Sequence, residues 1–477
     1  MKKKVDSVVI GSGPAGAITG AYLARAGMKT VIFEADSAVG GPRYGGYDLS
    51  GHHIDKMCHI PILFTAYNDG LGWWGKAAKE TGAAIKFQFM PNTVICMNGH
   101  MVSIPYCLNG VTMAEFVAGF SPFPFPDKSY KELVRTFDEI LAMPKDVVYS
   151  MEMECTPFQT WLERVTDDDM VKRLLAVLAA IIYVASADVI LKNTSVTAIV
   201  GSVFQGLIGG YANMTMILGD GCDGLPKGFC SVVMNHGGEV LTNHPVQKVL
   251  IENGHATGVV VKNDKGGEDT YEAPYIIMAS NFASVSQLID EAFIPQKIHD
   301  IIRGFTSLYH STGIDVDFLM SKEYAVLKAS QIIVMSGEGA QMDYRGAILM
   351  PSFFEPMLSP PGKQVIKAEK IIEVKYAEKM SDADFIKEAT EFVEIAYPGF
   401  SRHVEATHVG RATPVLHFSI LPGEKLPLQF PGVSGLYMCG DACQSPGIAT
   451  ERAASSAMTV AKSILRKESK GFLVGTN

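Results

Sequence analysis

The pattern of apolar and polar positions along the first 34 residues changes twice, from a strand-like run to a helical pattern and back to a strand-like run. Residues 5–10 form an apolar, β-branched run, residues 11–16 are rich in glycine, and residues 17–26 are rich in helix-forming residues. Gly27 ends this helical pattern, and residues 29–34 are again apolar and β-branched. The pattern predicts a strand, a tight turn, a helix and a second strand. Because such crossovers are right-handed, the two strands are expected to be parallel neighbours.

The pattern changes in the second quarter of the chain. Residues 105–218 contain longer helical segments, for example 130–141 and 156–182. The long uncharged stretch 193–219 carries many polar residues and glycines, so we expect a buried helix and turn there rather than a membrane span. Residues 226–261 return to one helix and several strands, and Asn253-Gly254 predicts a hairpin between two of them.

The rest of the chain repeats this alternation. Residues 291–409 mix strands, such as 310–318 and 371–374, with a helix over 381–396. Residues 435–467 contain a short apolar strand, a glycine turn and a helix. The sequence therefore predicts α/β segments that are interrupted by two insertions.

Composition narrows the class of protein. The 477 residues include 41 Lys and Arg against 50 Asp and Glu, a formal net charge of −9, and the longest basic run is Lys2 to Lys4. We therefore expect no nucleic acid partner. The eight cysteines form no Cys-x-x-Cys pair and show no metal-type spacing, which predicts reduced intracellular thiols and no metal.

The expected location is the cytoplasm. The apolar run at residues 8–10 breaks at once into glycines, so it does not form an export signal. The apolar stretches 120–125 and 174–184 leave peripheral contact with a membrane open.

The strongest motif is the first glycine turn. Gly11 permits the sharp turn, Gly13 lets the backbone approach a diphosphate, and Gly16 lets helix and strand pack closely. Pro14 and Ala15 lie between them, at the start of a helix whose exposed amides bind phosphate. The predicted ligand is a dinucleotide.

An acid and a second glycine turn specify the dinucleotide further. Glu34 comes 18 residues after Gly16, at the end of the second strand, where its carboxylate can bind both ribose hydroxyls. That carboxylate disfavours the 2′-phosphate of NADP. Gly40 and Gly41 follow Glu34, with Arg43 just beyond, and such a loop is needed for FAD rather than NAD. We expect Ala35, Gly41 and Arg43 to contact FAD.

These residues resemble a known family, the flavoproteins that include amine oxidases, phytoene desaturases and GTPase dissociation inhibitors. Within it, the chain is most similar to the bacterial phytoene desaturase branch. The resemblance lies in the glycine turn with Glu34, in Gly40 to Arg43, in residues 225–261 and in residues 435–458. The chain departs from the family at Pro42, which stands between the glycine pair and Arg43.

The resemblance implies further cofactor contacts. Val246 would face the adenine, Gly440 and Asp441 would hold the ribityl and diphosphate, and the turn with Ile448 and Ala449 would lie beside the flavin ring. The FAD is expected to be non-covalent. The implied fold is α/β: a Rossmann-like FAD-binding domain, with a parallel sheet, helices and a β-meander, interleaved with a mixed α+β substrate domain. The expected FAD-binding parts are 1–104, 221–290 and 410–477, and the expected substrate parts are 105–220 and 291–409.

Three residues are candidates for acid–base or substrate chemistry. His52 follows the second glycine loop, within residues 47–55, which we expect to form one short polar strand. Glu451 opens the last helix, and His310 lies on a strand that lines the substrate cavity in relatives. A structural role is an open alternative for each of them.

The predicted function is that of an FAD-dependent oxidoreductase. Hydride would pass between flavin N5 and a carbon of a largely apolar or conjugated small molecule, in C–C desaturation or in reduction of an activated alkene. Open alternatives are an amine oxidase, a redox-neutral isomerase or hydratase, and a binding protein like the GTPase dissociation inhibitors. The sequence names neither the electron acceptor or donor nor the oligomeric state.

Overall fold

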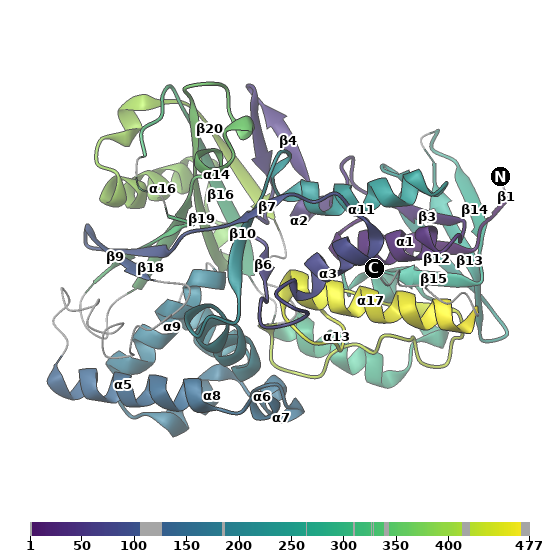
Figure 1. Cartoon of the computed structure of the whole chain (residues 1–477), viewed down its shortest axis with the longest axis horizontal. Coiled ribbons are helices and arrows are strands. Elements are labelled where there is room, and N and C mark those ends of the chain that lie inside the picture. The colour runs from purple at the N-terminus through teal and green to yellow at the C-terminus, as the bar shows by residue number, and fades with distance from the viewer. Residues whose placement is uncertain are drawn as a thin grey trace.

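The structure, a computed structural model, describes residues 2–104, 126–183, 187–263, 265–308, 311–325, 327, 329–337, 343–412 and 420–468. Within these ranges a five-stranded parallel sheet lies on the right of Figure 1, in the order β11-β3-β2-β15-β21. Its strands come from three distant parts of the chain: β2 Ser7–Ile10, β3 Thr30–Phe33, β11 Glu239–Leu241, β15 Tyr275–Met278 and β21 Leu436–Met438. The predicted parallel βαβ unit is confirmed.

Helices and a meander cover this sheet. Every residue of β2 and β3 is buried, as expected for parallel strands with both faces covered. The helices are α1 Pro14–Arg25, α3 Gly72–Thr81, α11 Gly224–Asn235 and α17 Ala449–Lys467, and the meander strands are β1 Lys2–Lys4, β12 Val246–Glu252, β13 His255–Lys262 and β14 Glu268–Glu272. Asn253 and Gly254 both have positive φ, so the hairpin predicted there is confirmed.

A second, mixed sheet lies at the upper left of Figure 1, with seven strands among the described residues. In sheet order they are β20 Val404–Ala412, β16 Ser311–Met320, β19 Gln364–Glu373, β18 Asp343–Leu349, β17 Ile332–Ser336, β8 Thr93–Met97 and β9 His100–Ile104. Helix α16, Asp382–Ala396, packs on one face of this sheet, and a capping box between Ser381 and Asp384 begins it.

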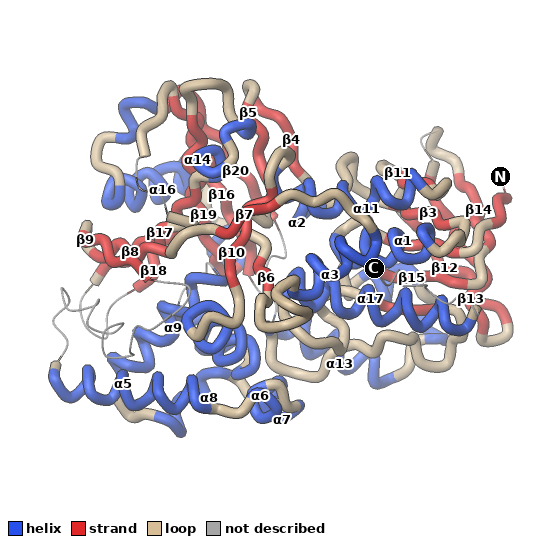
Figure 2. Tube along the Cα trace, viewed as in Figure 1, coloured by secondary structure: helices blue, strands red, loops and turns tan. Residues whose placement is uncertain are grey.

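Helices fill the lower left of the molecule, where Figure 2 shows them in blue. They are α5 Asp127–Ala142, α6 Lys145–Val148, α7 Met151–Cys155, α8 Phe158–Val165, α9 Asp169–Tyr183, α10 Ala187–Asn193 and a π-helix over Thr197–Ile208. The single helix predicted for 156–182 is wrong, because α8 ends at Val165 and a second helix begins, where Asp168 accepts hydrogen bonds from the amides of Met170 and Val171 in the first turn of α9. In the described part of the chain, no helix combines the length and apolarity needed to cross a lipid bilayer.

Short elements connect the two halves. The polar strand predicted for 47–55 is a hairpin, β4 Gly46–Leu49 and β5 His52–Asp55, since Ser50 and Gly51 both have positive φ. The remaining elements are β6 Ile62–Leu63, β7 Phe87–Phe89, β10 Asn213–Ile217, α2 Gly41–Tyr44, α12 Ser284–Leu288, α13 Gln296–Leu308, α14 Pro351–Phe354 and α15 Val374–Ala377. Strand β8 pairs with β17, and β9 pairs with β8, so both belong to the second sheet although residues 1–104 were expected in the FAD-binding part. The expected boundaries stay predictions.

Candidate active site

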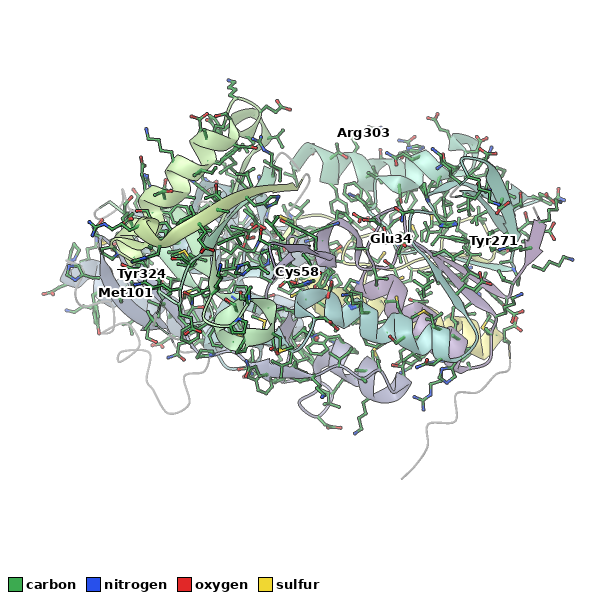
Figure 3. All side chains as sticks on the ribbon, turned by 90° about the horizontal axis from the view of Figure 1, so that it is seen from above. Glu34, Cys58, Met101, Tyr271, Arg303 and Tyr324 are labelled. Atoms are coloured by element: carbon green, nitrogen blue, oxygen red, sulfur yellow. The ribbon has the colours of Figure 1, made fainter. Side chains whose placement is uncertain are left out.

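A cavity of about 770 Å³ lies between the two sheets. Four residues of its wall follow the carboxyl ends of parallel strands: Gly11 after β2, Glu34 after β3, Ala279 after β15 and Cys439 after β21. Ligands of open parallel sheets bind at these strand ends. The opposite wall comes from β16 and β20 of the seven-stranded sheet. Figure 3 labels Glu34 in the half with the parallel sheet and Cys58 between the halves.

The first glycine turn is shaped for an anion. Gly13 caps α1 without any side-chain hydrogen bond, and the first turn of the helix has no acidic residue. Its amides therefore remain available to a phosphate. A Cβ on Gly16 would lie 2.0 Å from the carbonyl oxygen of Gly11, whereas a Cβ on Gly13 would meet no protein atom within 4 Å. Gly16 thus maintains the turn, and Gly13 leaves open space for the ligand.

Glu34 connects the two glycine turns through hydrogen bonds with Ser12. Its Oε2 accepts hydrogen bonds from the Ser12 amide at 2.9 Å and the Ser12 hydroxyl at 2.7 Å, while Oε1 accepts one from the Asp36 amide at 2.9 Å. The Ser12 hydroxyl in turn accepts a hydrogen bond from the Gly40 amide at 2.9 Å. Oε1 retains capacity for a further donor, and the carboxylate lines the cavity, as a ribose-binding acid must.

The second glycine turn meets the C-terminal segment across the cavity. Arg43 Nη1 lies 3.5 Å from Asp441 Oδ2, and the Tyr44 hydroxyl is hydrogen-bonded to that of Thr450. Gly440 has a φ of +147°, and a Cβ there would also meet no protein atom within 4 Å. These open positions around the turns fit a bound dinucleotide.

Most predicted cofactor residues line this cavity. They are Gly11, Gly13, Pro14, Ala15, Glu34, Ala35, Gly41, Arg43, Gly440, Asp441 and Ala449. Gly16, Val246 and Ile448 do not line it. Gly16 is enclosed by the turn, Val246 packs against the core at the start of β12, and Ile448 is completely buried before α17. The contacts expected for Val246 and Ile448 therefore stay predictions.

Two of the three catalytic candidates point away from the cavity. His52 is buried and its Nδ1 lies 3.0 Å from the Ser359 hydroxyl. Glu451 is completely buried and accepts hydrogen bonds from the amides of Trp73 and Trp74 at the start of α3. Neither side chain lines the cavity, which favours the structural alternative for both, and their catalytic roles stay predictions. His310 lies outside the described residues.

The sequence analysis missed a set of charged residues on the cavity side of the seven-stranded sheet. Along β16, Ile314, Val316 and Phe318 pack toward α16, while Asp315 and Asp317 line the cavity. Side chains alternate between the two faces of a strand, so this period of two is what separates them. The sequence signal that could have found them is the pair of acidic residues at alternate positions of an otherwise apolar strand.

Six side chains form a continuous series of contacts here, which we call the polar strip. Its members are Tyr47, His408, Asp317, Lys367, Asp315 and His59. The Tyr47 hydroxyl lies 2.8 Å from His408 Nδ1, which lies 3.4 Å from Asp317 Oδ2. Lys367 Nζ lies 2.7 Å from Asp317 Oδ1 and 3.2 Å from Asp315 Oδ2, and His59 Nε2 lies 3.4 Å from Asp315 Oδ2.

Charges within the polar strip compensate one another. Burial opposes the charge of Lys367, but Asp315 and Asp317 raise its pKa, and Lys367 holds the pKa of Asp317 below its ordinary value against the effect of burial. Burial and Lys367 also oppose the charge of His59, yet Asp315 raises its pKa. Asp315 and Asp317 therefore share the buried ammonium group of Lys367, and Asp315 favours the protonated form of His59.

Glu369 extends this cluster as a neutral acid. Burial, together with Asp315, raises the pKa of Glu369 to about 8. The potential ligand atoms of His59, Asp315 and Glu369 lie within 4.8 Å of one another. The ammonium group of Lys367 supplies positive charge beside them.

Comparison with known proteins gives the same architecture. The model of the family "Flavin containing amine oxidoreductase" matches residues 108–465, and a model of an NAD(P)-binding Rossmann-like domain matches residues 9–69. Prolycopene isomerase of Daucus carota is 21% identical over 500 aligned residues, which cover 92% of this chain and 77% of that protein.

Solved structures are similar over nearly the whole chain. An oxidoreductase from Methanosarcina mazei superposes with a TM-score of 0.70 at 18% identity, covering 97% of this chain and 100% of the other. Cyclohexylamine oxidase from Brevibacterium oxydans gives a TM-score of 0.65 at 14% identity, covering 98% and 99%. At these identities the similarity establishes the fold.

Proposed function

Because this chain belongs to the family of flavin-containing amine oxidoreductases, we propose that it transfers hydride between flavin N5 and a carbon of an uncharged, largely apolar small molecule. The chain is an FAD-dependent oxidoreductase that acts on small-molecule substrates. The type of substrate, the reaction and the site residues are the proposal.

One observation carries the proposal: the cavity that begins at the two glycine turns continues to the polar strip. A dinucleotide on the glycine turns would reach toward the seven-stranded sheet and leave the substrate beside that sheet. When bound, FAD supplies a hydride acceptor or donor at N5. The protein's task is to hold the reacting carbon about 3–3.5 Å from that atom and to exclude water.

We assign the cavity-lining glycines and acids to FAD. The backbone N–H groups of Gly13 and Ala15 would bind the diphosphate, Glu34 the ribose, and Arg43 with Asp441 the part of the cofactor near α17. Burial raises the pKa of Cys439 to about 12, so this thiol stays protonated, which supports a non-covalent cofactor.

The charge balance of the polar strip favours an uncharged substrate. Asp315 and Asp317 already share the Lys367 ammonium, and Asp315 also faces His59, so little uncompensated negative charge is left to attract an ammonium group. A cavity wall with this charge balance would not stabilise the protonated amine that an amine oxidase binds as a cation. The curated relative is named for prolycopene, which agrees with an apolar or conjugated substrate.

An anaerobic screen tests this function. The FAD-loaded protein is mixed with benzylamine or with β-carotene in detergent micelles, and the dithionite-reduced protein with 2-cyclohexen-1-one, while flavin absorbance is recorded. We expect a change with β-carotene or 2-cyclohexen-1-one and none with benzylamine. Bleaching by benzylamine alone would contradict the proposal. Altered β-carotene isomers without any change in flavin absorbance would instead indicate redox-neutral isomerisation.

A further inference from the structure

The polar strip contains a partly exposed histidine that a molecule in the cavity can reach. The side chain of His408 is 36% exposed, whereas those of Asp315, Asp317 and Lys367 are at most 2% exposed. Both His408 and the two carboxylates line the cavity. A histidine at this place connects the cavity with the buried charges behind it.

We propose that His408 exchanges a proton with the substrate through Nε2, while Asp317 and Tyr47 hold a proton on its Nδ1. This inference rests on the proposed function, since it assigns an acid–base group to the same reaction. It replaces His52 and Glu451, which the fold directs away from the cavity.

The orientation of the imidazole supports this role. Asp317 and His408 are directly paired on neighbouring strands β16 and β20, so the backbone register fixes their separation. Tyr47 reaches the same ring from β4, with its hydroxyl 2.8 Å from Nδ1 against 3.5 Å from Nε2, and its ring lies edge-on to the imidazole at 5.4 Å. Which imidazole nitrogen carries the proton is set by the hydrogen bond that the other makes. Partners at Nδ1 therefore direct Nε2 to the reaction.

Lys367 and Asp315 complete the support of the ring. Lys367 on β19 binds Asp317 Oδ1, which leaves Oδ2 for the imidazole. The buried Oδ1 of Asp315 has no hydrogen-bond partner among the described residues, although it lines the same cavity. Buried acceptors are normally satisfied, so this oxygen marks a place where a donor of the ligand would bind.

The proposed step balances for a desaturation. Hydride leaves one carbon with two electrons and goes to flavin N5, while the C–H bond of the adjacent carbon breaks and its electron pair forms the C=C bond. The proton of that second bond passes to His408 Nε2, and the carboxylate of Asp317 stabilises the resulting imidazolium. Because the ring is partly exposed, it returns the proton to water after the product has left. Alkene reduction is the reverse of these transfers.

A spectroscopic experiment tests the orientation without a substrate. Full-length, FAD-loaded protein is labelled with 15N-histidine, and the His408 signal is identified by its loss in H408Q. We expect the neutral ring to carry its proton on Nδ1 in the wild type, and D317N or Y47F to redistribute that proton toward Nε2. A wild-type ring protonated on Nε2, or one unaffected by both substitutions, would overturn the proposal.

Kinetics then test the chemical role. With the screened compound that changes flavin absorbance, H408Q should slow that change about 100-fold, a usual contribution of an acid–base group. Its dissociation constant for the same compound should stay within about threefold, and added imidazole should restore part of the rate to H408G. H403Q, outside the cavity, is the matched control and should behave as the wild type.

The outcomes separate this proposal from the proposed function. If no screened compound changes flavin absorbance, the proposed function fails, and the NMR result still decides the orientation of His408. If a compound reacts with H408Q at the wild-type rate, the function stands and the role of His408 is refuted. Thermal unfolding checks that every variant is folded. If H408Q is not folded, the same measurements on D317N and Y47F decide the role of His408.

Discussion

Lys367 Nζ lies 2.7 Å from Asp317 Oδ1, and both side chains are at most 2% exposed. The two residues are paired on neighbouring antiparallel strands, β16 and β19, so the sheet itself brings them together. Removing one partner of a buried ion pair leaves a charge without compensation. This contact therefore contributes to the stability of the cavity wall as well as to its charge.

Replacing Lys367 by methionine should destabilise the protein strongly. K367M would leave Asp315 and Asp317 facing each other without their shared ammonium, and the expected loss is about 3–5 kcal/mol in the free energy of unfolding. Denaturant unfolding measures it. K370M is the matched control, since Lys370 on the same strand pairs with Glu388 near the surface and should cost about 0–1 kcal/mol. Equal losses in both variants would contradict the role of the buried pair.

Glu369 should make stability decrease as the pH rises. Its pKa is about 8 in the folded protein against about 4.3 for an exposed glutamate, so the folded state binds this proton more tightly. The associated stability is full below about pH 4.3 and is lost as the pH rises to about 8.

The E369Q variant isolates this effect because it stays neutral at every pH. Relative to E369Q, the wild type should lose on the order of 4 kcal/mol between pH 5 and pH 8.5, measured by denaturant unfolding at each pH. Glu388 lies on α16, which covers the same sheet, and it pairs with Lys370 near the surface. The difference in the free energy of unfolding between E388Q and the wild type should therefore show no such change with pH. A constant difference between the wild type and E369Q would mean that Glu369 is ionised throughout this range.

Two alanine substitutions in the first glycine turn should separate folding from cofactor binding. At Gly13, a φ of −60° accepts alanine and the added methyl would meet no protein atom, so G13A should keep its melting temperature within about 2 °C without FAD. Its affinity for FAD should fall about 100-fold, because the methyl occupies the space of the diphosphate. Calorimetric titration with FAD measures the loss.

G16A should behave in the opposite way, since its methyl collides with the Gly11 carbonyl and should cost about 1–3 kcal/mol of stability before any ligand is added. G304A is the control for alanine itself, because Gly304 lies in α13 with open space around it and should gain about 0.5–1 kcal/mol. Tight FAD binding by G13A would exclude the first turn as the diphosphate site.

Glu451 should matter for folding and not for the reaction. E451A should cost about 1–3 kcal/mol, because it removes the acceptor for the buried amides of Trp73 and Trp74. E451Q keeps an acceptor oxygen and should lose less. With either variant, the dissociation constant for FAD and the rate of flavin absorbance change should stay within about threefold of the wild type. A folded E451Q that is 100-fold slower would restore Glu451 as a residue that acts on the substrate.

The sequence analysis succeeded where the required information is local. Gly11, Gly13, Gly16 and Glu34 lie within one βαβ unit of about 30 residues, and their spacing follows from the length of one strand and one helix. It was less successful at element boundaries. The hairpin at residues 46–55 was predicted as one strand, since Ser50-Gly51 is a weaker turn signal than Asn253-Gly254.

For this protein the sequence alone determined the fold class and the cofactor, and it located the two glycine turns proposed to bind that cofactor, because backbone conformation and hydrophobic period are set by neighbouring residues. Only the tertiary structure decided which acids and bases face the cavity. Tyr47 and His408 are 361 residues apart, and their contact exists only because β4 lies against the edge of a seven-stranded sheet. The same tertiary structure places Glu451 against α3, where its buried carboxyl group accepts hydrogen bonds from two backbone amides.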